Sequence, residues 1–72
     1  MLKITLKIDG MMCGMCEAHI NDAIRSHFPA KKVSSSRRKG ETVFYMAEAP
    51  DMERLQAVLH ETGYELKGVT VS

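Results

Sequence analysis

The spacing of apolar residues changes from a strand pattern to a helix pattern twice along this chain of 72 residues. Residues 2–8, LKITLKI, alternate apolar and polar side chains, which predicts a strand with one buried face. From residue 15 to residue 28, apolar side chains recur every three or four positions, which predicts an amphipathic helix that Pro29 stops. The side chains on this helical stripe are Cys16, Ile20, Ala23, Ile24 and Phe28.

The second half of the chain holds two further strand patterns before its own helix. Residues 41–47, ETVFYMA, are rich in β-branched and aromatic side chains, which favours a strand. The preceding residues 30–40, AKKVSSSRRKG, have Val33 as their only strongly apolar side chain, and their many charges suit the edge of a sheet. A turn at Lys39 and Gly40 is predicted to join the two strands.

A second helix is predicted to begin after Pro50, with Asp51 as its N-cap, and to end with Gly63 in the C′ position. A last strand follows at residues 64–71, YELKGVTV. The buried stripe expected on this helix consists of Met52, Leu55, Val58 and Leu59.

The resulting order, β-α-β-β-α-β, predicts the fold class. Two right-handed β-α-β units in one open sheet place both helices on the same face. We therefore expect an α+β, ferredoxin-like sandwich with a four-stranded antiparallel sheet, formed by one domain over residues 1–72. The other face of the sheet is expected to be open to water, with Val43 and Tyr45 beside Lys3, Thr5 and Lys7.

Composition excludes several classes of protein. Hydrophobic residues make up 44% of the chain, which predicts a globular fold, and a formal net charge of +1 gives no strong attraction to nucleic acid or membranes. No apolar run is long enough for membrane insertion, and no signal-peptide core precedes the first strand, so we expect a cytoplasmic protein. RKGETVFYM faintly resembles a strand of RNA-recognition motifs, but Glu41 stands where an aromatic is needed, which argues against RNA binding.

The two cysteines of the chain, Cys13 and Cys16, lie three positions apart in GMMCGMCEA. Cys16 is expected in the first turn of the helix, where unpaired backbone N–H groups and the positive end of the helix dipole favour a thiolate. Two thiolates at this spacing can converge on one metal ion. A C-x-x-C pair also occurs in thiol redox proteins, so redox chemistry is a second possible function of the pair.

The residues around the pair favour a soft ion of low coordination number. A structural zinc site usually needs four ligands, and the chain has neither a second C-x-x-C nor two histidines at ligand spacing. Cu(I) prefers thiolates and accepts two of them. His19 lies one helical turn after Cys16 and is a candidate third ligand, although a surface histidine is the favoured interpretation. His27 and His60 are interpreted as surface residues.

GMMCGMC resembles the G-M-x-C-x-x-C loop of the heavy-metal-associated domain family, and TGYE resembles the segment of bacterial copper chaperones that follows their second helix. The family includes copper chaperones and the N-terminal domains of metal-transporting P-type ATPases. The resemblance covers nearly the whole chain and implies that Cys13 and Cys16 are the metal ligands. It also implies that Met11 is a buried anchor of the loop and that Tyr64 shields the site.

Two positions depart from the pattern of the family. Met12 stands where copper-handling members often have a small polar residue or histidine, and we interpret it as a soft contact residue beside the metal. The segment VSSSRRK is less apolar than the second strand usually is. Residues 31, 32 and 37–39 are basic and suit a solvated edge or contact with an acidic partner.

We therefore expect a Cu(I) chaperone that is not an enzyme. The competing interpretations are a Zn(II), Cd(II) or Hg(II) protein that uses the same pair, and a thiol redox protein. The expected partner is a metal-transporting P-type ATPase or another C-x-x-C protein, and the chain is expected to be a monomer or a metal-bridged dimer. Its start at Met1 and end at Ser72 favour a free-standing protein over a domain excised from an ATPase.

Overall fold

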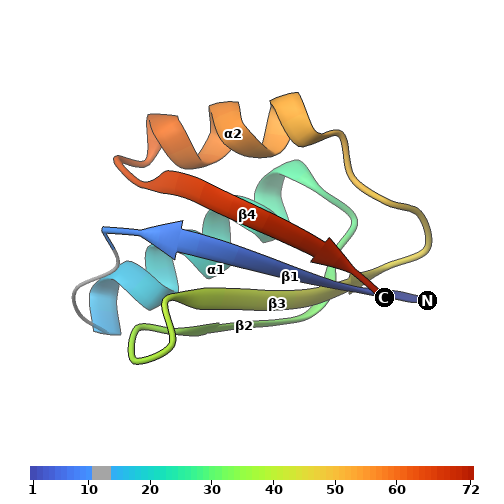
Figure 1. The fold of residues 1–72 in the computed structure, drawn as a ribbon, viewed down its shortest axis with the longest axis horizontal. Helices are drawn as coiled ribbons and strands as arrows, with labels where there is room; N and C mark the ends of the chain where they lie inside the picture. Colours follow the sequence, from blue (N-terminus) through green and yellow to red (C-terminus); the bar gives the residue numbers. More distant parts are fainter. Residues whose placement is uncertain (11–13) are drawn as a thin grey trace.

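The predicted order of elements is confirmed by the computed structural model, which describes residues 1–10 and 14–72 (Figure 1). In these residues the sheet has the strand order β2-β3-β1-β4, and each neighbouring pair is antiparallel. The fold class is therefore the expected α+β, ferredoxin-like one. The elements are β1 Leu2–Asp9, α1 Gly14–His27, β2 Lys31–Ser36, β3 Glu41–Met46, α2 Met52–Glu61 and β4 Glu65–Val71.

The alternation of side chains in β1 produces the buried face of the sheet. Ile4, Leu6 and Ile8 are buried on the side where both helices pack. Ile20 and Ile24 of α1 and the buried stripe of α2 meet these strand residues in one hydrophobic cluster. This cluster fixes both helices to the same face of the sheet.

The face of the sheet away from the helices carries the side chains that the alternation predicted there. Lys3 pairs with Tyr45, and Thr5 pairs with Val43. Lys7 pairs with Glu41 on the same face and forms an ion pair with it, with Nζ 3.1 Å from Oε2. These side chains are exposed or half-buried, which confirms the expected open face.

The second strand lies at an edge of the sheet, as its charges predicted. Its register with β3 shifts between Lys31 and Ser34, and Lys32 adopts a positive φ of 53° in this bulge. The bulge turns Val33 into the core. Such an irregularity also makes an edge strand a poorer template for pairing with another chain.

The predicted ends of the second helix are confirmed, but one residue of its stripe was wrong. Asp51 is the N-cap and accepts a hydrogen bond from the Glu53 N–H at 2.9 Å. Leu55, Val58 and Leu59 are buried, whereas Met52 is 41% exposed. Met52 is the first residue of α2 and lies about 60° from Leu55 around the helix axis, so it falls at the margin of the buried stripe.

The start of α1 and the two termini lie at opposite ends of the molecule (Figure 1). The end of β1, the β2–β3 turn, the α2–β4 turn and the start of α1 gather at one end, and both termini lie at the other (Figure 1). Lys3 and Ser72 exchange backbone hydrogen bonds of 2.8 and 2.9 Å, which ties the termini together. Within the described part of the chain, no helix is long and apolar enough to cross a membrane.

Candidate metal centre

The first turn of α1 carries Cys16. The helix begins at Gly14, so Cys16 lies in its first turn, at the positive end of the helix dipole. Its side chain is half-buried and packs against the hydrophobic core. This position agrees with the one expected from the sequence and lies at the end of the molecule where the β2–β3 and α2–β4 turns gather (Figure 1). Met11, Met12 and Cys13 lie outside the described residues, so their predicted roles stay predictions.

The end of α2 positions Tyr64 beside the start of the cysteine loop. The Gly63 N–H donates to the His60 carbonyl at 3.0 Å, and the Tyr64 N–H donates to the Leu59 carbonyl at 2.9 Å. This is the hydrogen-bond pattern of a Schellman motif, and Gly63 has the positive φ, 91°, that the motif requires. The motif directs the chain back toward the sheet and sets the place of the Tyr64 ring.

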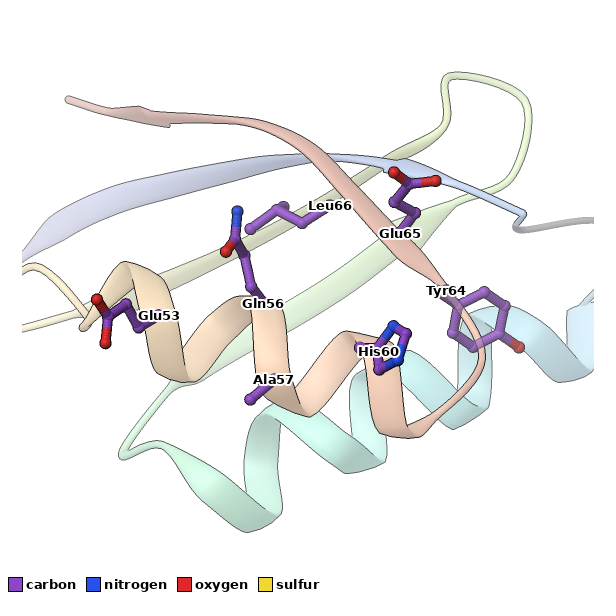
Figure 2. A pocket seen from close by; sticks show the side chains of 7 residues that line it. All are labelled: Glu53, Gln56, Ala57, His60, Tyr64, Glu65 and Leu66. Atoms are coloured by element: carbon purple, nitrogen blue, oxygen red, sulfur yellow. The ribbon is translucent and has the colours of Figure 1, made fainter.

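The Tyr64 ring covers Gly10, the last described residue before the cysteine loop. The ring is half-buried and packs against the core, and a Cβ added at Gly10 would lie 3.5 Å from Tyr64 Cδ1. In Figure 2 the ring points away from Glu53 and Gln56, past the end of α2 toward the first turns of α1. The structure thus brings Tyr64 to the end of the molecule that carries Cys16. Its shielding of a metal remains a prediction.

Two shallow grooves meet at Tyr64. One groove runs between α2 and β4, and Figure 2 shows the residues that line it. The other is lined by Asp9 and Gly10 of the first strand end together with the α2–β4 turn. His60, Tyr64 and Glu65 line both grooves. The carboxylates of Asp9 and Glu65 therefore lie around the same groove as Gly10.

Glu17, the residue after Cys16, is hydrogen-bonded to the β2–β3 turn at the same end of the molecule. Its Oε2 accepts a hydrogen bond of 2.8 Å from the Arg37 backbone N–H in the β2–β3 turn, 20 residues away. The turn itself is held by Gly40, whose carbonyl accepts from the Ile8 N–H at 2.8 Å. The first turn of α1 is therefore joined to the β2–β3 turn and, through it, to β1.

His19 is exposed on α1, one turn beyond Cys16. Among the described residues, no group of three or more His, Cys, Asp or Glu side chains is arranged to hold a metal ion. Because Cys13 lies outside those residues, ligation by His19 stays a prediction. His27 and His60 are also exposed, as expected.

A search against protein-family models gives no match. A mercuric reductase of Lysinibacillus sphaericus is 34% identical to this chain over 65 residues, which are 90% of the chain and 12% of the reductase. The chain therefore spans about an eighth of the length of this curated relative.

Solved structures of metal-binding proteins share the fold. The CopZ metallochaperone has a TM-score of 0.77 and 17% identity, and the match covers 90% of this chain and 98% of CopZ. The N-terminal domain of ZntA in its Zn(II) form has a TM-score of 0.77 and 21% identity, with 92% and 89% covered. A copper-binding domain of HMA7, a P-type ATPase, has a TM-score of 0.76 and 18% identity, with 100% and 95% covered.

The fold is thus that of small metal-binding domains and metallochaperones. The resemblance to the heavy-metal-associated domain family is confirmed at this level, because the chain has the fold of that family over at least 90% of its length.

Sequence reasoning missed the role of Glu17 in the architecture of this end. An acidic residue in the first turn of a helix is common because it interacts favourably with the helix dipole, so nothing in the local sequence marks it out. Its partner is a backbone group 20 residues away, which no side-chain pattern reveals.

Proposed function

We propose that this chain is a carrier of soft metal ions, which holds one ion between Cys13 and Cys16 and passes it on by thiolate exchange. The observation that carries the proposal is the position of Cys16, half-buried in the first turn of α1 on the fold of a metallochaperone. Such a helix terminus stabilises a thiolate, and the core beneath it supplies a rigid support.

The transfer we propose breaks no bond in an organic substrate, so the proposed role is binding and delivery and not catalysis. The two thiolates hold the ion in low coordination, which leaves it open to a further ligand. A cysteine of an acceptor protein attacks the metal, a three-coordinate bridged species forms, and the ion then moves to the acceptor as the first thiolate leaves. The acceptor we propose is a metal-transporting P-type ATPase or another protein with a cysteine pair.

Cu(I) is the cargo we favour. Thiolates select soft cations, and Cu(I) needs only two of them. Zn(II) prefers four ligands and accepts carboxylates. The carboxylate nearest to Cys16 in sequence, that of Glu17, already accepts a hydrogen bond from Arg37, which directs it toward the β2–β3 turn. This arrangement supports a site of two thiolates.

Hg(II) is the second candidate cargo, and a specific observation favours it. The relative at 34% identity is a mercuric reductase, and the match covers 90% of this chain. Hg(II) is a soft ion that two thiolates can also hold. With this cargo, the same cysteine pair would capture Hg(II) and deliver it to a second thiol pair.

The decisive experiment is an anaerobic titration of the reduced chain with Cu(I), Hg(II) and Zn(II), each against a competing chelator. We expect one Cu(I) per chain, bound much more tightly than Zn(II), and loss of tight binding in Cys13→Ser and in Cys16→Ser. Retention of tight Cu(I) binding by either serine variant would overturn the proposal. Tighter capture of Hg(II) than of Cu(I) from thiol-containing buffer would make Hg(II) the preferred cargo.

Two further measurements distinguish a copper carrier from a zinc protein and from a thiol redox protein. Zinc binding that matches copper binding and falls in His19→Ala, but not in the exposed control His27→Ala, would indicate a zinc site with His19 as a ligand. Absence of metal binding together with rapid disulfide exchange would instead indicate a thiol redox protein.

A further inference from the structure

A chain of polar side chains joins α1 to the edge of the sheet. Ser35 of β2 donates a hydrogen bond of 2.6 Å to Asn21 Oδ1, and its Oγ lies 2.8 Å from Thr42 Oγ1 of β3. Because Ser35 has one hydroxyl hydrogen and gives it to Asn21, the hydroxyl of Thr42 is the donor of the second bond. Thr42 is fully buried, and Ser35 and Asn21 are half-buried.

Glu17 extends this contact by one turn toward the metal-binding end of α1. Glu17 and Asn21 are four positions apart, so they lie on the same stripe of the helix. The first bonds to the backbone of Arg37, and the second to the side chain of Ser35. We call these four side chains, Glu17, Asn21, Ser35 and Thr42, the polar seam.

The polar seam differs physically from the apolar contact beside it. Ile20 and Ile24 of α1 are fully buried, and the burial of their apolar surface holds the helix on the sheet. Apolar contacts tolerate a shift of the helix along its axis more readily than hydrogen bonds do, because hydrogen bonds need a fixed distance and direction. Buried polar groups can in this way select one register at little gain in stability.

We propose that the polar seam fixes the axial position of α1 and thereby sets the place of Cys16, with Glu17 and Asn21 as positioning residues for the metal site. Glu17 is adjacent to Cys16, and its bond to Arg37 holds that turn of the helix against the β2–β3 turn. The inference rests on the proposed function, since it assigns the seam a role in metal affinity.

The first test replaces the interior of the seam with apolar side chains in the triple variant Asn21→Leu, Ser35→Ala, Thr42→Val. We expect a thermal midpoint equal to or above that of the wild type, because a buried polar network can be replaced by apolar groups without loss of stability. Despite this, Cu(I) affinity should fall several-fold in the chelator competition. In the reduced, metal-free protein, amide hydrogen exchange in the first two turns of α1 should become faster.

The second test concerns Glu17 alone and remains informative if the triple variant does not fold. Glu17→Ala should weaken Cu(I) binding several-fold, and Glu17→Gln, which keeps an oxygen acceptor for the Arg37 N–H, should retain most of the affinity. Glu53 is the matched control, because it is the acidic residue in the first turn of α2 and is exposed. Glu53→Ala should leave Cu(I) affinity unchanged.

The outcomes separate this inference from the proposed function. If the wild type binds no soft metal, the proposed function fails, and the seam is then tested by amide exchange alone. If the wild type binds Cu(I) but the triple variant and Glu17→Ala bind it equally well, the seam has no positioning role. If Glu17→Gln and Glu17→Ala both bind Cu(I) more tightly, the charge of Glu17 acts on the site and positioning is overturned.

Discussion

At the scale of single residues, the turn formed by Thr62, Gly63 and Tyr64 places an aromatic ring beside Gly10, just before the cysteine loop. The positive φ of Gly63 allows the Schellman motif to close, and the motif positions the next residue, Tyr64. A Cβ at Gly63 would meet nothing within 4 Å, so only the backbone conformation opposes an alanine there. A glycine is thus required for a conformational reason and not for lack of space.

Gly63→Ala should therefore lower the free energy of unfolding by about 1 kcal/mol, the cost of a left-handed conformation for a residue with a Cβ. Urea denaturation of the reduced, metal-free chain measures this loss. Gly68→Ala is the matched control, because Gly68 lies in β4 without a positive φ, and its added Cβ would make ordinary contacts with Lys7 at 3.9 Å. A loss at Gly68 as large as that at Gly63 would contradict the conformational explanation.

Tyr64 should control how easily the metal leaves. The half-buried ring covers Gly10, the last described residue before Cys13, and we expect its removal to ease the approach of competing ligands from that side. We expect Tyr64→Ala to accelerate Cu(I) removal by a chelator several-fold, and Tyr64→Phe, which keeps the ring, to behave like the wild type. Stopped-flow competition measures both rates. Equal rates for the alanine variant and the wild type would assign the ring a packing role only.

At the scale of elements, the sequence predicted most where one local signal decides the structure. The alternation of β1 defined its buried face, and Asp51 and Gly63 defined the ends of α2. The prediction for Met52 was wrong because periodicity alone does not show where a buried stripe ends. The hydrogen-bond partners of Ser35 in β2 were not predictable, because Asn21 and Thr42 belong to two other elements.

For the candidate site, periodicity placed Cys16 in the first turn of α1. The hydrogen bond that Glu17 accepts from the Arg37 N–H was not predictable, because it depends on the whole fold.

The cap of α2 gives a test at this scale. Asp51 accepts a hydrogen bond from the Glu53 N–H, which otherwise has no partner within the helix. Asp51→Ala should cost about 1 kcal/mol of stability, while Asp51→Asn, also a good N-cap, should cost much less. Thermal unfolding should show a fall in Tm of roughly 4–8 °C for the alanine variant, given the size of the domain. An equal fall for both variants would show that charge, and not capping, is responsible.

At the scale of the whole molecule, the fold separates the termini from the proposed metal site. The paired termini lie at one end, and α1 begins at the other end with Cys16 in its first turn (Figure 1). Ile4, Leu6 and the buried stripes of both helices form the rigid body between the two ends. A longer chain joined at either terminus would therefore lie away from the end that carries Cys16, where we propose that the acceptor docks. The same arrangement suits both the free-standing carrier that we propose and a domain that covers about an eighth of a larger protein, as in the match to the mercuric reductase.

Metal binding should stabilise this whole unit through linkage. A ligand that binds only the folded state adds about 2.7 kcal/mol when its free concentration is 100 times its dissociation constant. For a domain of this size, that corresponds to a rise in Tm of roughly 10–20 °C. We expect this rise when free Cu(I) is held at such a level by a chelator buffer, and no rise for Cys13→Ser or Cys16→Ser, each compared with its own metal-free form. Because Cys16 packs against the core, its serine variant should have a lower metal-free Tm than the wild type. An equal rise in both serine variants and the wild type would place Cu(I) at a different site and contradict the cysteine-pair centre.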